Sequence, residues 1–192
     1  MILPIVAYGH PILRKISTDI APDYPELSQL IENMWETMYH SNGMGLAAPQ
    51  INKAIRLFVI DTEQVYEKAD EEDKEDFDGE IGFKKVFINA HILELNGEPW
   101  SCDEGCLSLP GFREEVSRES EVVLEYCDAS FNKKVESFKG LNARVILHEY
   151  DHIEGKLFID HISLIKKKLL KKKLDDISAG RVKPGYKMLF PK

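Results

Sequence analysis

The feature that most constrains this chain is an apolar stretch that leads into two histidines four residues apart, His148 and His152, with Glu149 directly after the first. Residues i and i+4 of an α-helix lie one turn above each other, about 40° apart around the axis. Both imidazoles can therefore point at one metal ion, and Glu149 can reach a water molecule held by that ion. The pattern predicts a buried helix over residues 141–154, ended by Gly155, that supplies two ligands of a metal site.

Length and composition are ordinary for a soluble globular protein. The 192 residues suit one domain, residues 1–192, with apolar and charged shares of 43% and 30%. No run approaches the ~18 continuous apolar residues of a membrane span, and the N-terminus lacks the pattern of a secretory signal. Three cysteines are too few, and an odd number, for a disulfide framework. We therefore expect a cytoplasmic protein with no membrane partner.

The net charge of −8 is concentrated in one segment. Residues 67–80 hold nine acidic residues and two lysines, a net charge of −7, so the rest of the chain sums to about −1. Without a global field, the charge gives no reason to expect DNA as a partner. An acidic, aromatic-poor run is typical of a solvated, mobile insertion. We expect residues 64–84 to form a surface insertion without chemistry.

The hydrophobic periodicity predicts an α+β domain, because strands precede and flank the buried helix. An amphipathic helix is expected from Tyr24 to His40, and a lysine-rich helix over 162–177 that belongs to a C-terminal helix and tail, 162–192. Strands are expected at 55–60, 85–89, 91–95, 120–128 and 134–138, with a turn at Asn96-Gly97, a loop over 101–112, a turn at Pro110-Gly111 and a hairpin across 129–132.

A catalytic zinc or iron site commonly uses three protein ligands and leaves one position open for water, so a third ligand is needed. The peptidase pattern HExxHxxGxxH matches as far as Gly155, but its last position is Phe158, which cannot bind a metal. A glutamate on the next helix is a weak alternative, because that helix carries mainly lysines. Cys106 is the better candidate, since a loop cysteine beside a glycine can approach an ion as a soft thiolate ligand. Cys127 is expected to be a packed hydrophobe, and Cys102 a pocket-lining residue, although a ligand role for it stays open.

Three separated motifs resemble the signature boxes of peptide deformylases. They are the stretches Gly43–Gln50 (GMGLAAPQ), Glu104–Ser108 (EGCLS) and His148–His152 (HEYDH). Their order and approximate spacing match, and Gly9–Arg14 is also similar to the N-terminal stretch of the family. The resemblance covers residues 1–165, and only the acidic insertion is longer than a compact member needs.

The resemblance implies an α+β fold in which antiparallel strands pack around a central HExxH helix, with an N-terminal and a C-terminal helix. It implies a metal-dependent hydrolase that removes the formyl group from the N-terminal formylmethionine of newly made bacterial-type proteins and releases formate. It also implies one Fe(II) ion per chain held by Cys106, His148 and His152, which zinc or nickel can replace. A thiolate-bound, solvent-open Fe(II) site is exposed to oxidation by oxygen.

Within this resemblance, each catalytic role has a candidate. Glu149 is expected to be the general base, which takes a proton from the attacking water and gives it to the departing amine. The side-chain amide of Gln50 and the backbone N–H of Leu107 are expected to form an oxyanion hole. Without the resemblance, Gln50 is equally well explained as an amide that caps a loop. Gly45 is expected to leave room for the substrate backbone.

An apolar slot should hold the methionine side chain, with Met44, Val145 and Cys102 as candidate lining residues that are equally well explained as core. Glu104 and Asp151 are candidates to orient the metal ligands. Their possible charge partners are Arg118 and Arg144.

The lysine runs at 166–168 and 171–173 allow a contact with ribosomal RNA through its phosphates, although a solvated helix face explains them equally well. Two other functions stay open from the residues alone. One is an HExxH metallopeptidase that cleaves peptide bonds, which Phe158 and a thiolate ligand disfavour. The other is a structural metal module or an inactive metal-binding relative.

Overall fold

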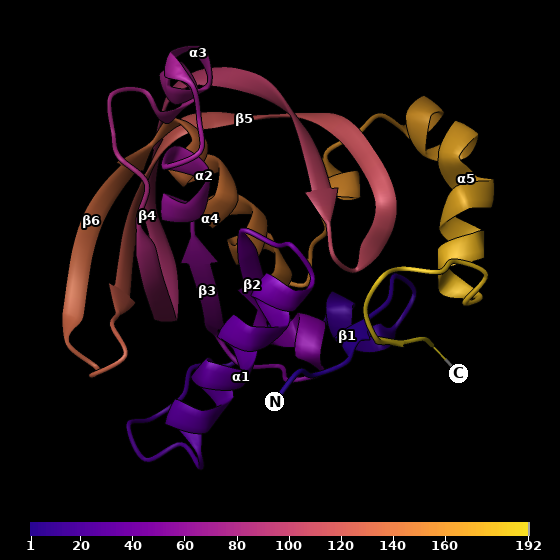
Figure 1. Cartoon of the computed structure of the whole chain (residues 1–192), viewed down its shortest axis with the longest axis horizontal. Coiled ribbons are helices and arrows are strands. Elements are labelled where there is room, and N and C mark those ends of the chain that lie inside the picture. Colours follow the sequence, from indigo (N-terminus) through magenta and orange to yellow (C-terminus); the bar gives the residue numbers. More distant parts are fainter. Residues whose placement is uncertain (192) are drawn as a thin grey trace.

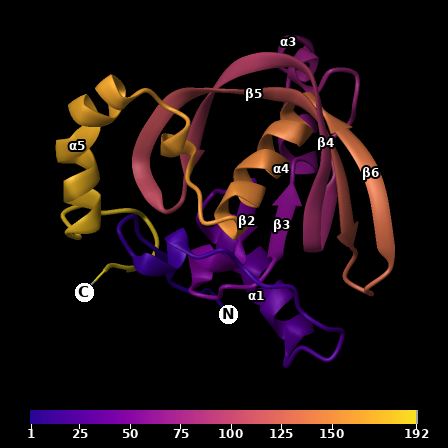
Figure 2. The ribbon, with the colours of Figure 1, turned by 180° about the vertical axis from the view of Figure 1, so that it is seen from behind.

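The computed structural model describes residues 1–191 and shows a five-stranded antiparallel sheet that bends around one helix (Figure 1). The helix is α4, Gly140–Ile153. The strands follow the order β2 (Gly45–Ala47), β3 (Leu57–Asp61), β4 (Lys84–Cys106), β5 (Leu109–Cys127) and β6 (Lys133–Lys139). Figure 2 shows α4 enclosed by β4, β5 and β6. The predicted α+β fold with antiparallel strands around the HExxH helix is confirmed.

The two faces of β3 show how the helices are held against the sheet. Because side chains alternate along a strand, Phe58 packs in the apolar cluster that contains Val145 of α4. Its neighbour Leu57 packs in a second cluster, which contains Met34 of α1, Leu27–His40. The sheet thus separates the N-terminal helix from the catalytic helix, and burial on both faces fixes the register of its short inner strands.

The remaining elements are short, apart from α5, Leu164–Ser178, which lies at one edge of the molecule beside the far end of β5 (Figure 1). The last described strand, β7 (Met188–Leu189), pairs in parallel with β1 (Ile5–Val6), so the C-terminal tail returns to the N-terminal segment. The other elements are α2 (Glu63–Tyr66), α3 (Glu71–Lys74) and 3-10 helices at Pro11–Arg14, Ala48–Ile51, Glu75–Phe77 and Phe158–Asp160. No helix in the described part of the chain is long and apolar enough to cross a membrane.

Three predictions about turns and loops are wrong. Asn96-Gly97 does not end a strand but lies inside β4, where a register shift between Asn96 and Pro99 absorbs these turn-forming residues, and Gly97 has a φ of +77°. The expected loop over 101–112 is the closed end of the β4–β5 hairpin, with only Leu107 and Ser108 between the strands. Pro110-Gly111 consequently lies within β5. The predicted hairpin across 129–132 is confirmed.

The acidic insertion is folded, contrary to the expectation of a mobile loop. It forms α2 and α3, and Phe77 is fully buried against the ring of Tyr66, with ring centroids 5.0 Å apart. A Cβ on Gly140, at the start of α4, would lie 2.3 Å from the carbonyl oxygen of Asp76. The insertion therefore packs against the beginning of the catalytic helix. The first helix begins later than predicted, after Glu26, whose left-handed backbone (φ +54°) is not helical.

Candidate active site

The structure brings the three predicted metal ligands together from two elements. His148 and His152 lie one turn apart on α4, and Cys106 is the last residue of β4. One donor atom from each of the three residues lies within 4.8 Å of the other two. The Sγ atom of Cys106 is 3.3 Å from Nε2 of His152. A tight two-residue turn, rather than the expected loop, holds the thiol over the helix.

The thiol is prepared for binding a cation. Burial alone would raise the pKa of Cys106, but the neighbouring imidazoles of His152 and His148 lower it to about 5. The thiolate, which is the form that binds metals, is therefore the main form near neutral pH.

Buried ion pairs orient His148. Its Nδ1 atom lies 2.9 Å from Oε2 of Glu104, which leaves Nε2 for a metal. Glu104 also accepts hydrogen bonds from Arg118 (2.6 and 2.9 Å) and Arg144 (3.0 Å). Arg118 donates to Asp151 at 2.7 Å, so both arginines and both acids considered in the sequence join one network. Burial acts to raise the pKa of Glu104, but the bonds from His148 and Arg118 hold it well below its ordinary value.

Phe158, the residue that fails the peptidase pattern, packs on the site instead. Its ring stacks on His148, with centroids 5.9 Å apart and planes inclined by 26°. A second contact, an edge-on one with Phe112 of β5, holds the Phe158 ring in place at a centroid distance of 5.9 Å. Phe158 thus restricts rotation of the His148 ring.

Glu149 is a buried carboxyl group directed into the site. It is 4% exposed, and its Oε2 atom has no hydrogen-bond partner among the described residues. Burial raises its pKa to about 7, although the adjacent histidines act to lower it. A Cβ on Gly45 would lie 2.5 Å from Oε1 of Glu149. The glycine thus makes room for this carboxyl group, a reason for glycine that the sequence did not reveal.

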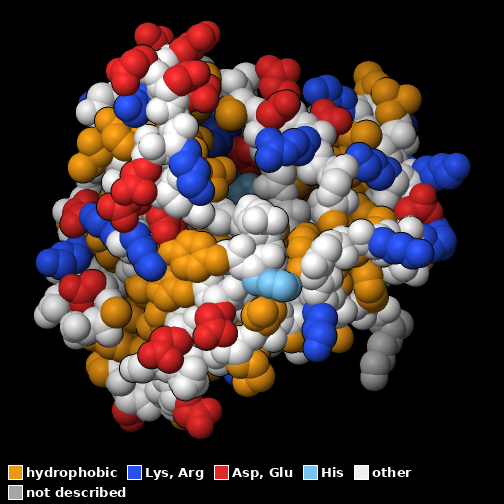
Figure 3. All heavy atoms as spheres, in the orientation of Figure 1, with side chains coloured by type: hydrophobic (Ala, Val, Ile, Leu, Met, Phe, Trp, Pro, Cys, Tyr) orange, Lys and Arg blue, Asp and Glu red, His pale blue; other side chains and the backbone are white. Residues whose placement is uncertain are grey.

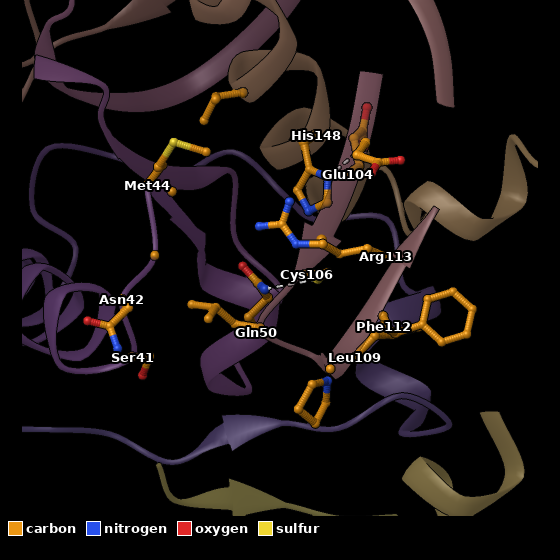
Figure 4. Close-up of a pocket in the computed structure, with 18 of the residues that line it drawn as sticks. Ser41, Asn42, Met44, Gln50, Glu104, Cys106, Leu109, Phe112, Arg113 and His148 are labelled. Atoms are coloured by element: carbon orange, nitrogen blue, oxygen red, sulfur yellow. Dashed lines mark hydrogen bonds and ion pairs between the residues drawn. The ribbon is translucent and has the colours of Figure 1, made fainter. Parts of the chain in front are cut away.

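The side chain of Gln50 is held with its amide N–H groups towards the ligands. Its Oε1 atom accepts a hydrogen bond from the N–H of Ala47 at 2.8 Å. Its Nε2 atom lies 3.5 Å from Sγ of Cys106 and 3.4 Å from Oγ of Ser108. The dashed line in Figure 4 marks the contact with Cys106. The residue both caps its own loop and presents a donor to the site, so the two readings of Gln50 are compatible.

A cavity of about 680 Å³ lies over these groups and opens as a hollow near the centre of the face shown in Figure 3. Met44, Gly45, Val145, Cys102 and Leu107 all line it, together with Gln50, Cys106, His148 and Glu149. His152 is buried and is not among the residues that line the cavity. Arg113, which points towards the hollow in Figure 4, and Tyr186 also line it, and sequence reasoning missed both. No local motif marks them, because β5 and the C-terminal tail bring them in.

The donor set fits one divalent metal ion. A thiolate and two imidazoles, one oriented by a carboxylate, converge beside a cavity that leaves room for water and substrate. Glu149, whose buried Oε2 atom has no partner among the described residues, lines the same cavity. A closed structural centre would instead use four protein ligands.

The family model described as polypeptide deformylase matches residues 2–168. The chain belongs to the peptide deformylase family. Peptide deformylases of Flavobacterium psychrophilum and Flavobacterium johnsoniae are 52% and 54% identical to it, over 100% and 99% of this chain and 99% and 96% of theirs. The crystal structure of peptide deformylase 1B from Arabidopsis thaliana with an inhibitor has a TM-score of 0.78 at 31% identity, covering 93% of this chain and 92% of that one. Peptide deformylase from Plasmodium falciparum gives 0.77 at 35% identity, covering 92% and 95%.

Membership in the peptide deformylase family confirms the predicted activity. The chain is a hydrolase that removes the N-formyl group from the N-terminus of newly made polypeptides. It has a metal cofactor, for which Cys106, His148 and His152 form a compatible group. The metallopeptidase alternative is not supported.

Proposed function

We propose that deformylation takes place in the cavity above Cys106, His148 and His152, and that Glu149 moves the proton. The observation that carries this assignment is the buried Oε2 atom of Glu149, which has no partner among the described residues, in a side chain that lines the same cavity as Cys106 and His148. A carboxyl group with a pKa near 7 can accept a proton and return it at neutral pH.

A metal ion held by the three ligands supplies Lewis-acid polarisation and acidifies water. Glu149 accepts the proton of the attacking water and passes it to the amine nitrogen as the C–N bond of the formyl amide breaks, which gives formate and a free N-terminus. Glu104 holds the His148 ring through Nδ1, and Phe158 restricts its rotation. The ligand therefore keeps one orientation throughout the reaction.

Gln50 and Leu107 stabilise the negative charge that develops on the formyl oxygen. The Nε2 group of Gln50 is directed towards Cys106 because its Oε1 atom is held by Ala47. The N–H of Leu107 belongs to the turn directly after Cys106. Loss of one such donor typically reduces the rate ~10²–10³-fold.

Met44, Gly45 and Val145 bind the substrate. All three line the cavity next to Glu149. Met44 and Val145 offer apolar surface to a methionine side chain, while Gly45 keeps the base and the substrate backbone close together. The small space at Gly45 also favours formyl over larger acyl groups.

The test is release of formate from formyl-Met-Ala-Ser by wild type and by Glu149→Ala. We expect Glu149→Ala to lose at least ~10³-fold in kcat and to keep its metal, measured by elemental analysis of the same sample. Glu154→Ala is a matched control, because Glu154 follows α4 but pairs with Arg56 rather than lining the cavity. Wild-type turnover by Glu149→Ala would remove the assigned role.

We propose Fe²⁺ as the native ion, with zinc or nickel able to substitute, because a thiolate with two imidazoles accepts all three metals. Cys106 is partly exposed to the cavity, where oxygen can reach it. Protein purified anaerobically should contain mainly iron and lose activity in air as Cys106 oxidises, while zinc- and nickel-loaded samples persist. Equal half-lives in air for all three forms would contradict this proposal.

We also propose that the chain forms a single cytoplasmic catalytic domain and that α5 contacts the ribosome, where its substrates emerge. The helix has only two buried residues and carries six lysines. Figure 3 shows basic side chains gathered over this side of the molecule. The lysines at 166–168 and 171–173, of which all but Lys167 are exposed, can neutralise RNA phosphates. Co-sedimentation with ribosomes should fall when the exposed Lys168 and Lys172 become glutamate, and unchanged binding would exclude the contact.

A further inference from the structure

The C-terminal tail forms part of the active-site wall. Beyond α5, the chain returns to the N-terminal segment, where the N–H of Ile5 donates to the carbonyl of Lys187 and the N–H of Ala7 to that of Leu189, both at 2.9 Å. This pairing places Tyr186 beside the cavity, which it lines together with its two preceding residues. The family model ends at residue 168, so this segment lies outside the matched region.

Tyr186 makes one directed contact with the site. Its hydroxyl donates a hydrogen bond to the carbonyl oxygen of Leu107 at 2.8 Å. Its ring packs at the edge of the apolar cluster that Leu107 and Met188 also join, which fixes the direction of the hydroxyl. Burial, followed by the charge of Cys106, raises the pKa of Tyr186, so the phenol keeps its proton and remains a donor at neutral pH.

Both carbonyl groups of the turn after Cys106 are held by the two ends of the chain. The N–H of Tyr8 donates to the carbonyl oxygen of Ser108 at 2.9 Å, while Tyr186 holds that of Leu107. A turn of only two residues can still rotate about the φ and ψ angles of its own residues. The carbonyl of Leu107 lies in the peptide plane after this residue, and its N–H lies in the plane before it, so only φ and ψ of Leu107 link the two groups. A hydrogen bond that holds the carbonyl therefore restrains rotation of the N–H plane about ψ of Cys106.

We propose that Tyr186 is a positioning residue, which aligns the backbone N–H of Leu107 with the developing oxyanion. The proposal rests on the role assigned to Leu107 above. Hydrogen bonds that stabilise a transition state depend on alignment, so a small rotation of the donor lowers the rate more than it weakens substrate binding. The tail thereby contributes to catalysis without touching the substrate.

The test compares Tyr186→Phe with wild type in deformylation of formyl-Met-Ala-Ser. The variant keeps the ring and loses only the hydroxyl, so we expect kcat to fall about tenfold with KM within about twofold. Metal content and the thermal midpoint should match wild type. Tyr66→Phe is the matched control, because the Tyr66 hydroxyl has no hydrogen-bond partner in the described part of the chain and lies away from the cavity. It should retain wild-type kcat.

Two outcomes would overturn the proposal. One is a kcat for Tyr186→Phe within about twofold of wild type, which would assign the residue to packing alone. The other is a fall in kcat matched by loss of metal or by a lower thermal midpoint, which would show a purely structural role. The proposed function is tested separately, by formate release from wild type and its loss in Glu149→Ala. The result for Tyr186→Phe does not affect that test.

Discussion

Helix α4, which contains the HExxH motif, and α5, which follows it, have nearly the same length and opposite environments. In α4, twelve of 14 residues are buried, whereas in α5 only two of 15 are, Leu174 and Ile177. Both carry many polar residues. In α4 those residues meet partners from distant strands, such as Glu104 and Arg118. The lysines of α5, apart from Lys173 over the Phe112 ring, face solvent or single acids on the surface.

The difference teaches where polar groups can perform chemistry. Charges in a low-dielectric interior interact strongly, so each buried group must be paired or have a function. On α4, buried side-chain nitrogen or oxygen atoms without a partner among the described residues belong to Arg144, Glu149 and His152. All three residues lie at the predicted site. On α5 the same types of group lie in water, where pairing has little effect.

The sharpest test of this contrast is Arg118→Leu. Arg118 is 6% exposed and bonds to Glu104 and Asp151, so its loss leaves two buried carboxylates short of a cation. We expect a loss of about 3–5 kcal/mol in the free energy of unfolding, measured in urea at equal metal content. Lys133→Leu, which removes an exposed pair with Glu125, should stay within about 0.5 kcal/mol. Similar costs for both variants would break the contrast.

The catalytic helix was predictable from the sequence because its signals are local. Helical periodicity, the His148–Glu149–His152 spacing and the glycine stop at Gly155 all lie within sixteen residues, and α4 spans nearly the expected range. The third ligand needed chemical reasoning, since Cys106 lies 42 positions earlier. The structure brings these donors together, and the roles assigned to them remain predictions.

What could not be predicted depends on tertiary pairing. Asn96-Gly97, which predicts a turn, lies inside β4 because a register shift accommodates it within the strand. The fit of Gly45 against Glu149 joins residues that are more than 100 positions apart. Tyr186 reaches the active site only because β7 pairs with β1, and no short motif encodes such a pairing. The fold of the acidic insertion depends on Phe77, one apolar residue within a charged run that would otherwise stay solvated.

An intermediate case, Asp160, lies between the two helices and gives the contrast a pH dependence. It accepts a hydrogen bond from the N–H of Leu157 (2.9 Å) and pairs with Arg14. Burial acts to raise the pKa of Asp160, but these partners lower it below its ordinary value of 3.8. Because the pKa of Asp160 is lower in the folded than in the unfolded protein, its charge stabilises the fold at pH values above the ordinary pKa. This stabilisation is lost as the pH falls through the pKa of the folded protein.

Asp160→Asn should therefore cost about 1 kcal/mol at neutral pH, because the amide keeps the size of the side chain and loses its charge. The difference from wild type should shrink once the pH falls below about 3.8. Urea unfolding of both proteins between neutral pH and about pH 3 measures it. A difference that stays constant over this range would show that the charge of Asp160 does not contribute.

The smallest effect is expected on α5. Lys171 pairs with Asp175 one turn later, and the two side chains are 73% and 53% exposed. Lys171→Ala should change the free energy of unfolding by less than about 0.5 kcal/mol, because water and salt screen the pair and ordering two long side chains offsets the attraction. Lys172→Ala is the matched control, since the neighbouring lysine is exposed and forms no ion pair within residues 1–191. The contrary result would be that Lys171→Ala is less stable than Lys172→Ala by more than about 1 kcal/mol. Ion pairs on the exposed helix would then contribute to stability as much as those around α4, and burial would not explain the difference between the two helices.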